Sequence, residues 1–177
     1  MTRQAVSIVA LLLVVVVAFW GMRAGWRART RRSAELVATL PAVPSDPGAQ
    51  RFGPVDATYV STTRAGDWLD RVTAQDLGVR SPARVVVFDA GVQITRQGAT
   101  DLFVPTVDLL GATSAPGMAG KVVGGDGLVV LTWRADPADP RGLDTGLRPK
   151  HAADRERLLA ALETLTPGQA PAQEENS

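Results

Sequence analysis

The chain has 177 residues, a formal net charge of +1, no cysteine and a single histidine, His151. The absence of cysteine excludes disulfides, thiol nucleophiles and cysteine-rich zinc sites. Residues 1–32 hold six of the 19 basic side chains and no acidic one, which leaves 13 basic against 18 acidic residues, a net charge of −5, from residue 33 onward. A net acidic domain is a poor candidate for nucleic-acid binding, which depends on the neutralisation of phosphates.

Residues 5–22 form an uninterrupted apolar run, AVSIVALLLVVVVAFWGM. A helix of this length extends about 27 Å, close to the roughly 30 Å hydrocarbon core of a bilayer. The alternatives are a buried helix of a soluble protein and a cleaved signal peptide. A signal peptide needs a shorter apolar stretch followed by small residues, whereas bulky and basic residues follow this run. We therefore predict a transmembrane anchor within residues 1–32.

Five arginines follow the apolar run within ten residues: Arg23, Arg27, Arg29, Arg31 and Arg32. By the positive-inside rule they predict that the C-terminal side of the span stays in the cytoplasm and that the N-terminus lies outside. The same side chains would face the anionic headgroups of the lipid bilayer. The simpler interpretation is that the cluster sets only the topology and contacts no specific lipid.

Residues 33–54 are predicted to form a Pro-rich linker. Residues 33–40 could prolong the membrane helix or form a short interfacial helix, and residues 41–54 form a semi-extended spacer because Pro41, Pro44, Pro47 and Pro54 interrupt regular structure. From residue 55 the pattern changes to short β-rich runs separated by Gly, Pro and Asp. The folded domain is therefore expected to span residues 55–166.

The β-rich runs predict six or seven strands in an antiparallel barrel or sandwich. The predicted segments are a strand at 55–63, a strand or helical turn at 66–78, a hairpin at 84–98, one or two strands at 100–113, a hairpin at 121–136 and a last strand at 141–149. Pro105 requires an edge, a bulge or a strand start. The second hairpin is expected to turn between Gly124 and Gly127.

The end of the chain changes to a helical period. Leu158, Leu162 and Leu165 recur along residues 151–165 at helical spacing, with charged residues between them. This pattern predicts an amphipathic helix whose apolar stripe packs over an open end or face of the sheet. Residues 167–177 are polar and contain prolines, so a disordered tail is expected.

Two local clusters accompany this order of elements. Val104, Pro105 and Leu109 form an apolar-Pro-x-x-x-Leu stretch, and Trp133 precedes the sequence LDTGLR at 143–148. With the single span and the Arg-rich exit, they make the chain similar to the actinobacterial single-pass membrane proteins with a pleckstrin-homology-like (PH-like) domain. Those proteins are often labelled export or transporter proteins. The resemblance implies a PH-like barrel closed by the C-terminal helix.

The chain departs from the phosphoinositide-binding PH pattern. The first predicted hairpin holds only Arg64 where such domains place several basic side chains, and the last helix has no Trp. Phosphoinositide binding is therefore not implied.

Motifs for chemistry are largely missing. Ser114 does not lie in a nucleophile elbow, the glycines at 124–127 lack a phosphate-loop pattern, and Asp136 and Asp139 lack calcium-loop spacing. We predict no catalytic, cofactor-binding or metal-binding residue.

The most interesting polar residues are Trp133, Asp144 and Arg148. If the two late strands are neighbours, Arg148 bonds a backbone carbonyl or pairs with Asp144 or Asp136, while Trp133 fills the barrel. The functional alternative is a partner-binding arginine beside an aromatic wall.

The sequence thus favours a membrane-anchored, non-enzymatic PH-like domain that acts as an interaction or scaffolding module at the cytoplasmic face. Its protein partner is unidentified, and neither a cofactor nor nucleic acid is expected. The alternatives are an outward-facing accessory protein for export or envelope assembly, and an enzyme with a degenerate site.

Overall fold

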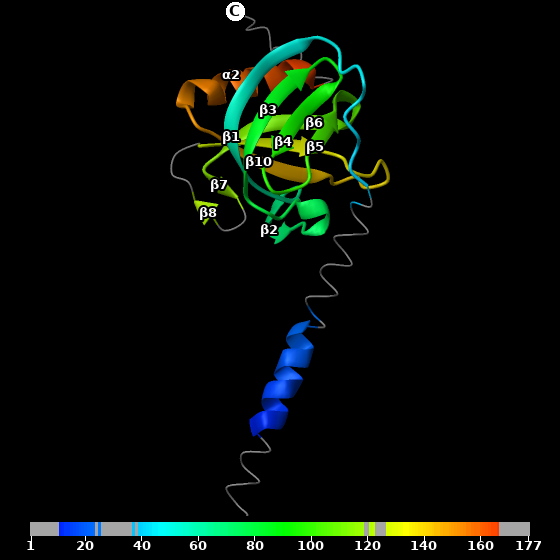
Figure 1. Cartoon of the computed structure of the whole chain (residues 1–177), viewed down its shortest axis with the longest axis vertical. Coiled ribbons are helices and arrows are strands. Elements are labelled where there is room, and N and C mark those ends of the chain that lie inside the picture. The colour runs from blue at the N-terminus through cyan, green and yellow to red at the C-terminus, as the bar shows by residue number, and fades with distance from the viewer. Residues whose placement is uncertain are drawn as a thin grey trace, which may run out of the picture.

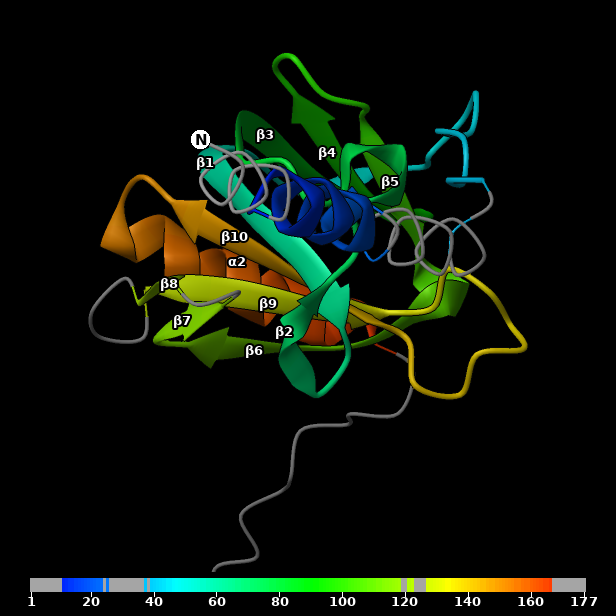
Figure 2. The ribbon, with the colours of Figure 1, turned by 90° about the horizontal axis from the view of Figure 1, so that it is seen from below.

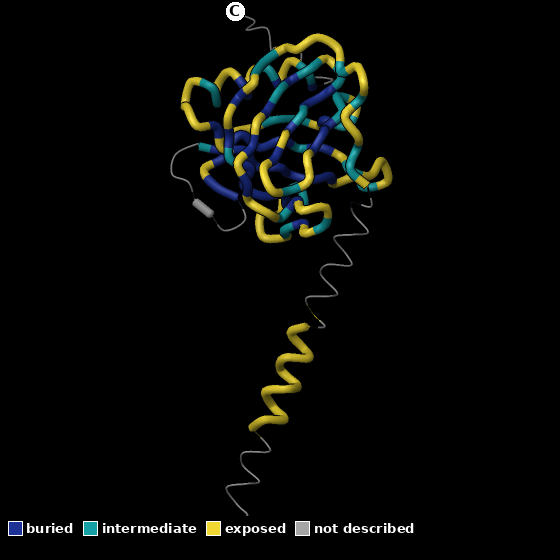
Figure 3. The backbone as a smooth tube through the Cα atoms, in the orientation of Figure 1, coloured by how far each residue is buried: buried dark blue, intermediate teal, exposed yellow. Residues whose placement is uncertain are grey.

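The computed structural model describes residues 11–23, 25, 37, 39–118, 121–122 and 127–166. Residues 11–23 are helical and exposed (Figures 1 and 3). Within the described ranges, no helix is both long and apolar enough to cross a membrane. The predicted span at 5–22 begins in residues outside the described ones. Four of the five arginines also lie outside the described residues: Arg27, Arg29, Arg31 and Arg32.

An eight-stranded antiparallel sheet makes up most of the domain, in the order β5-β4-β3-β1-β10-β9-β6, with β2 paired to β1 (Figure 1). Its strands are β1 (Gln50–Arg64), β2 (Asp67–Arg71), β3 (Ser81–Phe88), β4 (Gly91–Arg96), β5 (Leu102–Pro105), β6 (Leu109–Ala115), β9 (Leu128–Trp133) and β10 (Leu143–Pro149). The short strands β7 (Gly117–Met118) and β8 (Lys121–Val122) pair with each other. Two 3-10 turns, η1 (Ala74–Asp76) and η2 (Thr106–Asp108), complete the sheet connections.

Strand β1 joins the two halves of the sheet. Its first part pairs with β3, its later part pairs with β10, and its end pairs with β2. The register shifts between Phe52 and Val55 and again between Tyr59 and Ser61. Such irregularities increase strand bending, so the sheet curves around one core (Figure 2).

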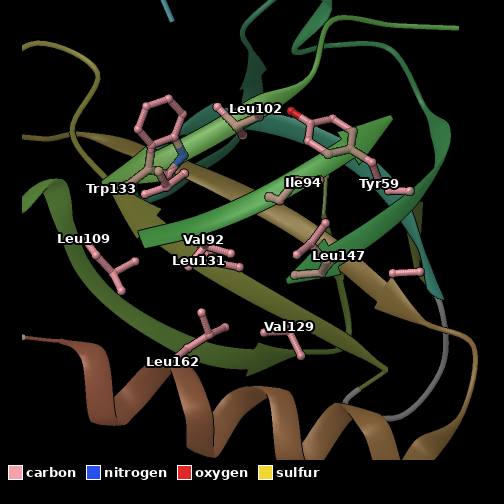
Figure 4. Close-up of a cluster of buried hydrophobic side chains, with 14 of the residues drawn as sticks. Tyr59, Val92, Ile94, Leu102, Leu109, Val129, Leu131, Trp133, Leu147 and Leu162 are labelled. Atoms are coloured by element: carbon pink, nitrogen blue, oxygen red, sulfur yellow. The ribbon is translucent and has the colours of Figure 1, made fainter. Parts of the chain in front are cut away.

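The core lies between this curved sheet and the C-terminal helix α2 (Ala152–Leu165) (Figure 4). Leu158 and Leu162 of α2 are 0% exposed and belong to the same apolar cluster as Trp133 and Leu147. The helix contacts β6, β1, β10 and β9. The predicted mainly-β antiparallel domain closed by an amphipathic helix is confirmed.

The predicted strand count is too low, and the hairpin at 121–136 is wrong. Ten strands lie in the described residues, eight of them in the main sheet. Strand β8 pairs with β7, whereas β9 lies between β10 and β6. Strand β8 has only two residues, too few for an alternation of apolar and polar side chains to show in the sequence. Strand β9 is apolar on both faces, which is typical of a strand with a neighbour on each side.

The predicted Pro-rich linker at 33–54 also needs correction. Val37 is 1% exposed within the core, and Leu40 packs against it. Strand β1 begins at Gln50 and includes Pro54. A proline is tolerated in a strand at an irregular position, where its missing N–H breaks no ladder bond, and Pro54 lies within the register shift between Phe52 and Val55.

Candidate functional site

Trp133, Asp144 and Arg148 do not form one site. Trp133 lies opposite Leu143 in the β9–β10 pairing, and opposite residues share a face of the sheet. Trp133 and the odd-numbered residues of β10 therefore point into the core, while Asp144 and Arg148 alternate onto the outer face. In the described part of the chain, Arg148 makes no hydrogen bond or ion pair with Asp144 or Asp136.

Trp133 belongs to a chain of buried polar contacts inside the domain. It is 0% exposed, and its Nε1 donates to Thr145 Oγ1 at 2.9 Å. Thr145 Oγ1 lies 2.7 Å from Thr62 Oγ1, which in turn bonds the Tyr59 hydroxyl. Tyr59 also donates to the Leu77 carbonyl at 3.0 Å. Burial raises the pKa of Tyr59 to about 12. These groups satisfy one another, which indicates a structural role.

A buried arginine closes one end of this network. Arg96 is 5% exposed, and its guanidinium lies 3.8 Å from the centre of the Tyr59 ring. It donates to Ser81 Oγ at 3.2 Å and to the carbonyls of Thr100, Asp76 and Val79 at 3.1, 2.9 and 2.7 Å. Desolvation lowers the pKa of Arg96. Because four of its five N–H donors are used by neutral acceptors inside the domain, Arg96 holds the η1 loop against the sheet, which indicates a structural role.

Asp144 of β10 connects three elements through hydrogen bonds of its side chain. It is 7% exposed, and its carboxylate accepts from Thr132 Oγ1 of β9 at 2.7 Å and from the Gly66 amide at 3.0 Å. Gly66 lies in the turn between β1 and β2. Asp144 therefore fixes the β1–β2 hairpin to the sheet.

Arg148 falls beside a charged cluster on the outer face. Thr58 lies opposite both Arg148 of β10 and Pro82 of β3. Asp56, two residues before Thr58, lies opposite Arg84, and its carbonyl accepts the Lys150 amide at 3.0 Å. We call Asp56, Arg84, Arg148 and Lys150 the outer basic patch. Three cations and one carboxylate give it a net charge of +2.

Asp56 is the centre of the outer basic patch. Its carboxylate lies 3.3 Å from Lys150 Nζ and 3.5 Å from Arg84 Nε. The hydrogen bond from Lys150 is the main reason why the pKa of Asp56 lies below its usual value. A pocket of about 290 Å³ opens here, lined by Asp56, Ala57, Pro82, Ala83, Arg84, Thr95, Gln97 and Lys150.

The β1–β2 hairpin presents a second surface. Trp68 is 47% exposed and Leu69 is 81% exposed, and we call this pair the apolar tip. Asp67 Oδ1 accepts the amides of Leu69 and Asp70 at 3.0 and 3.2 Å, which fixes the local backbone. The Arg64–Asp139 ion pair at 3.3 Å holds the base of the hairpin. The apolar tip is thus displayed on an ordered support.

The residues considered for metal binding and catalysis lie in separate parts of the domain. The described residues contain no group of three or more His, Asp or Glu side chains arranged to hold a metal ion. His151 is exposed before α2, and Ser114 is exposed on β6. Asp139 pairs with Arg64, while Asp136 accepts the Ala138 amide at 2.8 Å.

Neither surface was predicted from the sequence. The outer basic patch joins residues 56, 84, 148 and 150, which only the strand order brings together. The apolar tip had a weak signal, because Trp68 and Leu69 are adjacent and adjacent strand residues point to opposite faces. One of the two is therefore exposed unless both faces of β2 are covered.

Comparison with known proteins identifies the domain. A family model described as "Bacterial PH domain-like" matches residues 37–163, well over half of the chain. The match begins at Val37, the residue at which the described core begins. A comparison with curated proteins found no match.

Proposed function

Since the chain belongs to the bacterial PH domain-like family, we propose that it is a membrane-tethered, non-enzymatic interaction module at the cytoplasmic face of the cell membrane. The observation that carries the binding function is the apolar tip. Exposed Trp side chains are enriched among the residues that dominate binding energy at protein interfaces. The tip is therefore assigned to a protein partner.

The tether rests on the N-terminal sequence. The apolar run at 5–22 is long enough to span a bilayer as a helix. In its described part, Phe19, Trp20 and Met22 are 70–78% exposed, which is costly in water and favourable in lipid. The five arginines after the run favour a cytoplasmic domain.

The mode of partner binding follows from the shape of the hairpin. Asp67 and the Arg64–Asp139 pair order the backbone around the tip, so little conformational entropy is lost on binding. Trp68 then acts as the anchor for a hydrophobic pocket on the partner, while the adjacent Leu69 lies on the opposite face of β2. Truncation of a central aromatic anchor costs about 2 kcal/mol or more, roughly 30-fold in Kd.

The partner function is tested by photo-crosslinking of the full chain in cells. A photoreactive amino acid replaces Leu69, and the matched control carries it at Val107, which is also apolar and is 83% exposed. We expect a discrete protein adduct from position 69 that is absent from position 107. Trp68→Ala should reduce the yield of this adduct by at least about tenfold.

Equal labelling from both positions, or adducts with lipid alone, would refute the assignment of the tip to a protein partner. The topology is tested separately with Ala138→Cys, since the chain has no native cysteine and Ala138 is exposed. A cytoplasmic domain leaves this thiol unlabelled by an impermeant reagent in intact cells. Labelling there would place the domain outside.

A further inference from the structure

We propose that the outer basic patch is a second binding surface and that it takes an extended, acidic protein segment whose carboxylates lie about three residues apart. This surface differs from the apolar tip. Asp56 and Arg64 are eight residues apart on β1, a separation of up to about 26 Å along a strand.

The cations of the patch retain the capacity to bind an anion. Ideal charge-assisted hydrogen bonds measure about 2.7–2.9 Å, whereas Lys150 and Arg84 lie 3.3 and 3.5 Å from Asp56. Their side chains are 61% and 63% exposed. In the described part of the chain, the exposed side chain of Arg148 makes no hydrogen bond or ion pair.

The sheet spaces these cations for an extended segment. Lys150 follows β10 and Arg84 belongs to β3, with β1 between them, so their backbones are about 9.6 Å apart at about 4.8 Å per strand, while their charged groups lean toward Asp56 between them. An extended segment in the polyproline II conformation has three residues per turn and rises about 3.1 Å per residue, so its residues i and i+3 lie on the same side, about 9.3 Å apart. A segment crossing the strands therefore brings one carboxylate to Lys150 and the next to Arg84.

The other groups at the pocket suit the rest of such a segment. Thr95 and Gln97 line it and offer a hydroxyl and an amide to backbone carbonyls. Each oxygen of Asp56 meets only one cation, so the carboxylate can still accept an amide N–H from the segment.

Two features favour a protein segment over phosphate or a membrane surface. A phosphate dianion placed between the two cations would lie against the Asp56 carboxylate, whereas two separate carboxylates approach from opposite sides. The residues from 33 onward carry a net charge of −5, so an anionic membrane would be repelled by the rest of the domain. Only an anionic ligand small enough to contact the outer basic patch alone is attracted by the patch's local charge of +2.

The test uses the full chain in nanodiscs of zwitterionic lipid and a fluorescent peptide, Gly-Glu-Gly-Gly-Glu-Gly. We expect salt-sensitive binding that weakens at least about tenfold when both Glu are replaced by Gln. The Arg84→Gln and Lys150→Gln double variant should show the same loss. The matched control, Arg157→Gln on the exposed side of α2, should bind as the wild type does.

Inorganic phosphate and vesicles containing an anionic lipid serve as competing probes. Phosphate that displaces the peptide at equal concentration, or anionic vesicles that bind the wild type but not the double variant, would overturn the proposal. Equal binding of the Glu and Gln peptides, or no peptide binding, would overturn it as well. The result is independent of crosslinking at Leu69, so failure here leaves the partner function of the tip unaffected.

Discussion

Because Tyr59 is buried, we expect the folded chain to lose stability at alkaline pH. Its pKa is about 12 in the folded chain because the phenol is buried, whereas an exposed tyrosine in the unfolded chain titrates near 10. A pKa that is raised on folding contributes stability that is fully present below about pH 10. This contribution is lost as the pH rises through about 12.

The expected loss follows from the size of this shift. A shift of about two pH units corresponds to roughly 3 kcal/mol of unfolding free energy. The physical cause is that the ionised phenolate would lie inside the domain, 0% exposed, among Thr62, Thr145 and Leu77. The nearby Arg96 guanidinium moderates the shift, since its charge favours the phenolate.

The chain has only one tyrosine, so the ultraviolet absorbance of tyrosinate reports on Tyr59 alone. We expect the folded chain in mild detergent to resist ionisation until about pH 12, with ionisation and unfolding coupled. Urea unfolding of the wild type should weaken between about pH 10 and 12, by comparison with Tyr59→Phe. Titration near pH 10 with native structure retained would refute the burial argument.

The remaining predictions concern stability and are checked by urea unfolding of the full chain. Trp133→Ala should lower the free energy of unfolding by about 3–5 kcal/mol, because it empties the core and removes the bond to Thr145; an unchanged midpoint would mean that Trp133 is exposed. Arg96→Met should lower the free energy of unfolding by about 3 kcal/mol or more, since several buried acceptors lose their donor. Arg96→Lys should restore only part of this stability; full restoration would show that charge alone matters. Gly91→Ala should cost about 2–3 kcal/mol, because its Cβ would clash with the Val104 carbonyl; a stable variant would show that the turn adjusts.

The local sequence pattern was enough to predict the elements whose buried residues recur at a regular spacing along the chain. Leu158 and Leu162 recur at helical spacing, and both are buried against the sheet. The LVVLTW run is apolar on both faces, and β9 lies inside the sheet between two partners. The hairpin at 84–98 also forms, as β3 and β4, because its alternation and its Gly-containing turn agree.

Features that depend on strand order or on single side chains could not be predicted in this way. The sequence cannot show that Lys150, Asp56 and Arg84 share a row, because register across β10, β1 and β3 is a property of the whole sheet. Val37 was missed because one apolar residue packs into a core without any periodic pattern around it. Trp133 and Arg148 belong to paired strands, yet strand alternation places them on opposite faces.

Strand β1 connects both proposed binding surfaces with the interior of the domain. It carries Asp56 of the outer basic patch, continues through Tyr59 and Thr62 of the buried network, and ends at the hairpin that bears the apolar tip. The buried network and Asp144 fix the strand along its length, so neither surface can shift without breaking buried hydrogen bonds. Binding at one surface should therefore leave the affinity of the other unchanged. Two independent surfaces held at a fixed separation suit an adaptor that joins two partners, whereas a switch would need a strand free to move between two positions.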